Sequence, residues 1–110
     1  PGYDRALGRT GTDLDREVVR LAREAMGAGL AGIVCSPREL PAVREVVGAG
    51  GRLVVPGIRR AGDSAGDQAR TAAPGEAAAL GATHLVVGRP ILTAADPGRV
   101  FAEMSADVGA

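Results

Sequence analysis

Residues 52–70 read RLVVPGIRRAGDSAGDQAR, and residues 85–91 read LVVGRPI. Each stretch begins as a short apolar run and continues into a turn that contains glycine and arginine. Short runs of β-branched residues are typical of strands buried on both faces of a parallel sheet. Loops that follow such strands lie at the carboxyl end of the sheet, where α/β proteins bind their ligands. The two stretches therefore predict a parallel α/β fold with a ligand site at this edge.

Helices and strands alternate on either side of these stretches. Apolar spacing and capping residues predict helices over residues 13–27, 37–47, 74–80 and 97–104, strands over 31–35, 53–55 and 83–87, and loops over 56–72 and 88–95. Asp13 or Thr12, Ser36 and Asp96 are suited to cap the helices that follow them. An α-β-α-β-α-β-α order with short strands implies parallel pairing with helical crossovers.

Three strands fit two architectures, the middle of a small open sheet or an arc of a (β/α)8 TIM-type barrel. The chain has 110 residues, whereas a closed barrel takes about 250. The chain cannot close a barrel alone, and we expect residues 1–110 to form a single partial unit with no second domain.

The composition excludes several classes of partner. Thirteen basic and thirteen acidic residues cancel, and every basic residue is arginine, so no overall positive field would recruit nucleic acid. Cys35 is the single cysteine, which rules out an internal disulfide and favours a reducing cytoplasm. Because no apolar run approaches the roughly 20 residues of a membrane span, we expect no membrane partner and a cytoplasmic location.

Arg89 directly follows a predicted strand and stands between Gly88 and Pro90. A phosphate at this position could accept backbone N–H groups from Gly88 and Arg89 and a forked contact from the guanidinium. The alternative is that Arg89 pairs with a carboxylate on a neighbouring helix.

Arg59 and Gln68 lie nine residues apart in a loop that is long for a compact α/β unit. Glycines make this loop pliable, and a pliable loop with polar donors suits closure over a charged ligand. The alternative is a solvated loop in which Arg59 pairs with Asp63 or Asp67.

The remaining reactive residue types predict no catalytic or metal site. His84 begins a strand without a serine or cysteine partner at recognisable spacing, so we expect a structural histidine. Cys35 ends an apolar strand and is expected to be a small core residue. Asp63 and Asp67 have no metal-ligand partner, and we expect them to pair with arginines.

Taken together, the motifs resemble bacterial orotidine 5′-phosphate decarboxylase. The matching segments are GLAGIVCS at 29–36, LVVPGIR at 53–59, GDQAR at 66–70, LVVGRPI at 85–91 and ADP at 95–97. Their separations agree as well, with nine residues from Arg59 to Gln68 and twenty from Gln68 to Gly88. The resemblance covers nearly the whole chain.

This resemblance implies a fold, an activity and a set of substrate contacts. It implies strands six to eight of a (β/α)8 barrel, in a homodimer that converts orotidine 5′-monophosphate to uridine monophosphate without metal or organic cofactor. Gln68 and Arg89 would grip the 5′-phosphate, with Gly88 contributing backbone. Arg59 would contact the substrate, and Pro56 would lie near the pyrimidine.

The family's reaction centre is an Asp-x-Lys-x-x-Asp motif, which this chain lacks. Arginine cannot replace the proton-donating lysine, because guanidinium does not give up its proton near neutral pH. We therefore expect a chain that begins after the family's fifth strand and does not decarboxylate alone. Two alternatives stay open: a non-catalytic α/β fragment that self-associates through its unpaired sheet edges, and another phosphate-binding barrel such as a sugar-phosphate epimerase.

Overall fold

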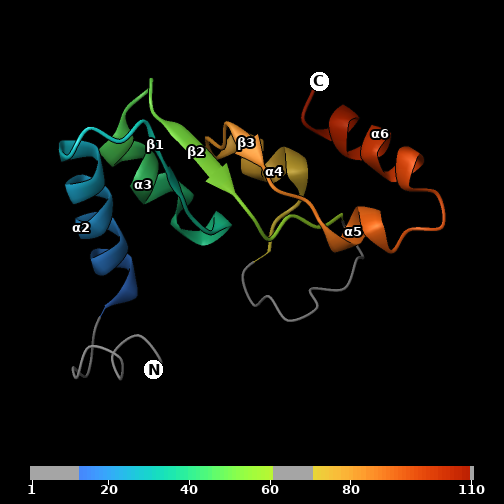
Figure 1. The fold of residues 1–110 in the computed structure, drawn as a ribbon, viewed down its shortest axis with the longest axis horizontal. Helices are drawn as coiled ribbons and strands as arrows, with labels where there is room; N and C mark the ends of the chain where they lie inside the picture. The colour runs from blue at the N-terminus through green and yellow to red at the C-terminus, as the bar shows by residue number, and fades with distance from the viewer. Residues whose placement is uncertain (1–12, 61–70, 110) are drawn as a thin grey trace.

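The computed structural model describes residues 13–60 and 71–109. In chain order the elements are α2 (Leu14–Gly27), β1 (Gly32–Val34), the 3₁₀ turn η1 (Pro37–Glu39), α3 (Leu40–Val47), β2 (Arg52–Val55), α4 (Pro74–Ala79), β3 (His84–Leu85), α5 (Arg89–Leu92) and α6 (Pro97–Asp107). Figure 1 shows the strands in the middle of the described chain, with α2 at one end and α6 at the other. The predicted alternation of helices and strands is confirmed.

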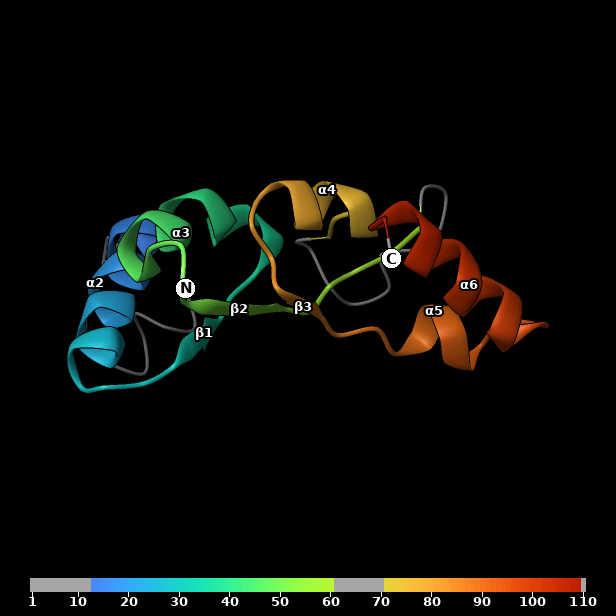
Figure 2. The same cartoon turned by 90° about the horizontal axis from the view of Figure 1, so that it is seen from above.

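The strands form one parallel sheet in the order β1-β2-β3. Gly32 pairs with Arg52 at the start of the sheet, and Val55 pairs with Leu85 at its end. α3 connects β1 to β2 and α4 connects β2 to β3; both helices lie on the same side of the sheet in Figure 2. The fold is therefore a run of parallel βα units, as the sequence predicts.

The core lies between the sheet and this helical layer. Its largest fully buried side chains are those of Leu40, Val43, Leu53, Val55 and Ile58. The opposite face of the sheet is open, with Val34 69% exposed and Val86 51% exposed. The expectation that the strands are buried on both faces is wrong for this chain, because no described element covers the second face.

Two of the three predicted caps are confirmed. The Asp13 carboxylate accepts hydrogen bonds from the backbone N–H groups of Asp15 and Arg16, at 3.1 and 3.4 Å, and Asp96 accepts one from Arg99 at 3.1 Å. Ser36 makes no side-chain capping bond. The chain instead forms η1 before α3, because Pro41 has no N–H to continue an α-helical turn and Leu40 N–H bonds to the Pro37 carbonyl in its place.

The predicted loop 88–95 is partly wrong, because α5 occupies Arg89–Leu92. Proline is favoured in a first helical turn, and Pro90 takes that position here. The predicted strand 83–87 shortens to His84–Leu85, which pairs only with β2 within the described residues. Among these residues no helix is long and apolar enough to cross a bilayer.

Arg44 joins successive βα units at the amino end of the sheet. Its Nη1 donates to the carbonyls of Gly48 and Gly51, each at 2.8 Å, and its Nη2 donates to the carbonyl of Gly81 after α4. One half-buried guanidinium thus satisfies carbonyl groups of the two turns that lead into β2 and β3. This edge is held together by the protein's own hydrogen bonds.

Candidate functional site

The two predicted binding loops leave the same edge of the sheet. Val55 and Leu85 are paired neighbours in parallel strands, and Arg59 and Arg89 each follow four residues later. The Val86 N–H donates to the Val55 carbonyl at 3.0 Å, so the two chains stay side by side beyond the paired strands. In Figure 1 both segments run on toward α5.

The start of the first loop is packed into the protein. Arg59 N–H donates to the Ala72 carbonyl at 2.9 Å, and Ala72 N–H donates to the Gly57 carbonyl at 3.2 Å. Ile58 is fully buried, Arg59 is 9% exposed and Pro56 is half-buried. The alternative of a solvated loop is therefore wrong for its first residues, which two backbone hydrogen bonds fasten to the segment that returns to α4.

The Arg59 side chain folds back on the chain that carries it. Its Nη1 donates to the Ile58 carbonyl at 2.8 Å. Arg59 therefore places a fixed positive charge beside the carboxyl end of β2.

Gly88 and Arg89 form the second arm of the predicted site. Gly88 precedes α5, and a Cβ added to it would meet nothing within 4 Å. The Arg89 side chain is exposed, while its carbonyl accepts from Thr93 N at 2.9 Å and from Thr93 Oγ1 at 2.7 Å. Thr93 thus holds the Arg89 carbonyl in place, and there is open space around Gly88.

Four residues of the sequence-based hypotheses lie outside the described residues, namely Thr12, Gln68, Asp63 and Asp67. The pairing of Gln68 with Arg89 on one phosphate stays a prediction. So does the alternative pairing of Arg59 with either aspartate.

Ser36 is a candidate that the sequence reasoning missed. It follows β1 at the same edge of the sheet, where Cys35 N–H still donates to the Val54 carbonyl at 3.1 Å. Its Oγ is buried and has no hydrogen-bond partner among the described residues. A buried polar group left without a partner costs about 1–3 kcal/mol, which marks this hydroxyl as a group that a ligand could satisfy. The available signal was a serine directly after a strand, which we assigned to helix capping alone.

The neighbouring Cys35 belongs to the core, as predicted. Burial raises the pKa of its thiol to about 11, with a smaller contribution from the nearby Glu39 carboxylate. A thiol with a raised pKa is a poor nucleophile at neutral pH, so the structure gives Cys35 a packing role.

His84 and Thr83 hold β3 to β2. Thr83 Oγ1 accepts from Leu53 N at 2.9 Å and donates to the Leu53 carbonyl at 3.1 Å. The His84 ring nitrogen Nδ1 lies 2.9 Å from the same hydroxyl. These contacts support the structural interpretation of His84. Within residues 13–60 and 71–109, no group of three or more His, Cys, Asp or Glu side chains is placed to hold a metal ion.

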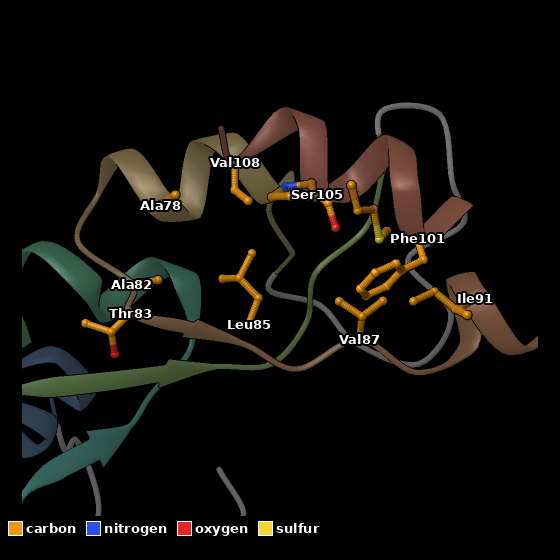
Figure 3. Close-up of a pocket in the computed structure, with 11 residues that line it drawn as sticks. Ala78, Ala82, Thr83, Leu85, Val87, Ile91, Phe101, Ser105 and Val108 are labelled. Atoms are coloured by element: carbon orange, nitrogen blue, oxygen red, sulfur yellow. The ribbon is translucent and has the colours of Figure 1, made fainter. Parts of the chain in front are cut away.

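An apolar cavity of 490 Å³ lies beside β3 on the side of α4 and α6. Figure 3 shows Leu85, Val87 and Phe101 directed into it. Its lining contains no charged side chain and none of Pro56, Arg59, Gly88 or Arg89. The lining of this cavity therefore offers no charged partner for a phosphate.

Parallel strands joined by helices, with the loops after β2 and β3 at one carboxyl edge, are the building pattern of (β/α)8 proteins. The model of the orotidine 5′-phosphate decarboxylase / HUMPS family matches residues 4–104. The chain belongs to this family, and the resemblance found in the sequence is confirmed.

Individual relatives agree with this assignment. An orotidine 5′-phosphate decarboxylase of Anaeromyxobacter sp. (strain K) is 58% identical over 92 residues, which cover 84% of this chain and 40% of the relative. One from Alkalilimnicola ehrlichii is 48% identical over 106 residues, which cover 96% of this chain and 45% of the relative. The crystal structure of the Lactobacillus acidophilus orotidine 5′-phosphate decarboxylase matches with a TM-score of 0.77 at 30% identity, over 96% of this chain and 42% of that one.

The chain thus spans about 40% of the length of the curated relatives that it matches. The predicted fold class, a parallel α/β arc of a (β/α)8 barrel, is confirmed. The family assignment disfavours the sugar-phosphate epimerase alternative.

Proposed function

We propose that this chain is the phosphate-binding part of an orotidine 5′-phosphate decarboxylase of pyrimidine biosynthesis. The observation that supports it best is the pairing of Val55 with Leu85. This pairing carries two arginine-bearing loops to one edge of the sheet, where parallel α/β proteins bind ligands.

Each proposed contact follows from the position of its residue. Arg89 and Gln68 grip the 5′-phosphate of the nucleotide, with the Gly88 backbone beside it, because charge-assisted and forked hydrogen bonds suit a dianion. Arg59 contributes positive potential from the neighbouring loop. Pro56 and the Ser36 hydroxyl lie nearer the sheet, where the base of the nucleotide would sit.

We propose that this chain binds the nucleotide but does not decarboxylate it. The chain contains no lysine, and a guanidinium does not release a proton to a carbanion near neutral pH. Decarboxylation is assigned to the complete enzyme, which uses no metal or organic cofactor. A decarboxylase assay on this chain would detect no product, and sustained turnover would overturn this part of the proposal.

Calorimetric titration with uridine monophosphate tests the site. Arg89→Ala should weaken binding at least about tenfold, since a charge-assisted hydrogen bond contributes about 1.5–3 kcal/mol. Arg52→Ala is the matched control, because Arg52 is an exposed arginine at the opposite end of β2. Unchanged affinity in Arg89→Ala, or equal losses in both variants, would exclude the phosphate site.

A second proposal is that the protein is a homo-oligomer in the cytoplasm. The open sheet face carries exposed Val34 and Val86, and parallel sheets are usually covered on both faces. The buried free thiol of Cys35 suits a reducing compartment. Sedimentation should show an oligomer; an oligomer without affinity for uridine monophosphate would favour a self-association module over the nucleotide site.

A further inference from the structure

Glu103 joins the segment that follows β2 to the last helix. Its Oε2 accepts from Arg60 Nη1 at 2.8 Å, and its Oε1 accepts from Arg99 Nε at 3.2 Å. Arg99 lies one turn earlier in α6, whereas Arg60 is 43 residues away in the sequence. The contact between Arg60 and Glu103 is therefore a tertiary link between the first binding loop and α6.

α6 also supports the second binding loop. It packs against α5, which begins at Arg89, and Figure 2 shows the two helices side by side. At the other end of α6, Asp107 Oδ2 accepts from Gly75 N at 2.7 Å in the first turn of α4. α6 is thus fastened to the helical layer and is a fixed support that both loops contact.

A contact that restrains the position of Arg60 also restrains the position of Arg59. The two residues are adjacent, and Arg59 N–H is bonded to the Ala72 carbonyl. If the link to α6 were lost, the first loop would lose one of its described tertiary contacts and would keep the two backbone bonds between residues 57–59 and Ala72. The position of the Arg59 charge relative to Arg89 would then be less well defined.

We propose that Glu103 is a positioning residue for the nucleotide phosphate: it holds Arg60, and through Arg60 it sets Arg59 relative to Arg89 across the carboxyl edge. This inference rests on the proposed function. Glu103 itself does not touch the ligand. Hydrogen bonding from Arg60, with a smaller contribution from Arg99, holds the pKa of the Glu103 carboxyl below its ordinary value.

The test uses Glu103→Gln, which removes the charge and keeps the size of the side chain. The first measurement is amide hydrogen exchange at Arg59 and Ala72 in the ligand-free chain, which should become faster by about two- to fivefold, the range of an exposed ion pair. The second is the affinity for uridine monophosphate, which should fall by a similar factor. Arg60→Gln should reproduce both effects, and the double variant should add little to either.

Glu45→Gln is the matched control, because Glu45 is an exposed carboxylate on α3. It should change neither measurement. Unchanged exchange at Arg59 and Ala72 in Glu103→Gln would overturn the link itself. Faster exchange with unchanged affinity, while Arg89→Ala still weakens binding, would overturn the positioning role and leave the phosphate site standing. Absence of binding by the unmodified chain would overturn the proposed function and the positioning role together, and the exchange data would still report on the link.

Discussion

The two ends of the sheet use the same residue types in opposite ways. At the amino end, Arg44 donates to three backbone carbonyls, and Gly32 allows β1 to approach the backbone of Arg52. At the carboxyl end, Arg89 is exposed and Gly88 faces open space. Arg44 and Gly32 thus make close contacts at the amino edge, whereas Arg89 and Gly88 leave open space at the carboxyl edge.

This contrast between two pairs of residues agrees with the division of roles between the two faces of barrel proteins. In (β/α)8 proteins the amino face serves stability and the carboxyl face binds ligands. The unpartnered hydroxyl of Ser36 lies at the carboxyl face, whereas the Thr83 hydroxyl, close to the amino face, both accepts and donates a hydrogen bond. Substitutions at the amino edge should therefore change mainly the free energy of unfolding, and those at the carboxyl edge mainly the affinity for uridine monophosphate.

The largest effect is expected from Gly32→Ala at the amino edge. The new Cβ would lie 2.7 Å from Arg52 Cβ and closer still to the Arg52 carbonyl oxygen, so β1 and β2 would have to separate. The free energy of unfolding, measured in urea, should fall by about 3 kcal/mol. Gly27→Ala is the control, because a Cβ at Gly27 meets nothing within 4 Å. Equal stability of the two variants would show that the strands do not pack this closely.

Arg44→Ala should have the next largest effect. Removing the guanidinium leaves the carbonyls of Gly48, Gly51 and Gly81 without their donor, which should lower the free energy of unfolding by about 2 kcal/mol. Affinity for uridine monophosphate should change little in the fraction that stays folded. Arg23→Ala, on the exposed side of α2, should be neutral. A neutral Arg44→Ala would show that the amino edge does not depend on this side chain.

Cys35 predicts a loss of stability at high pH. The pKa of its thiol is 9.0 in a model peptide and about 11 in the folded protein, so the folded state retains the proton longer than the unfolded state. The contribution of the protonated thiol to the free energy of unfolding is fully present below pH 9 and is lost as the pH rises toward about 11. Urea unfolding across this range should show a decline that Cys35→Ala lacks; parallel curves for the two proteins would contradict the burial of the thiol.

Ser36→Ala should cause the smallest loss of stability and should leave the free energy of unfolding unchanged or raised, because an unpartnered buried hydroxyl is removed. The variant removes a buried hydroxyl that has no partner among the described residues, so no hydrogen bond is broken. Affinity for uridine monophosphate should nevertheless fall. A marked loss of stability with unchanged affinity would make Ser36 a structural residue and remove it from the site.

Much of this fold could be predicted from local patterns. Asp13 and Asp96 before their helices, and the apolar runs 53–55 and 85–87, predicted the elements and their parallel order. The structures around Ser36 and Gly88 were harder to predict, because neighbouring residues decide whether a cap or a loop forms there. Near Pro41 the chain forms η1 where we predicted a capped α-helical turn. Near Pro90 it forms α5 where we predicted a loop.

The candidate site was only partly accessible from the sequence. The loops after β2 and β3 could be assigned to one edge because parallel strands end together. The burial of Arg59 and its bond to the Ile58 carbonyl could not be predicted from the sequence, because they depend on the tertiary contact between Ile58 and Ala72. The link between Arg60 and Glu103 joins residues too distant in sequence for any periodicity to indicate.

The central claim is that nucleotide phosphate binds at the carboxyl edge between β2 and β3. The direct test is a titration of the ¹⁵N-labelled chain with uridine monophosphate, followed by amide chemical shifts. The shifts should concentrate at Gly57, Arg59, Gly88 and Arg89, with Arg52 and Gly81 at the amino edge unmoved. Shifts confined to the amino edge or to the apolar cavity beside β3 would contradict it.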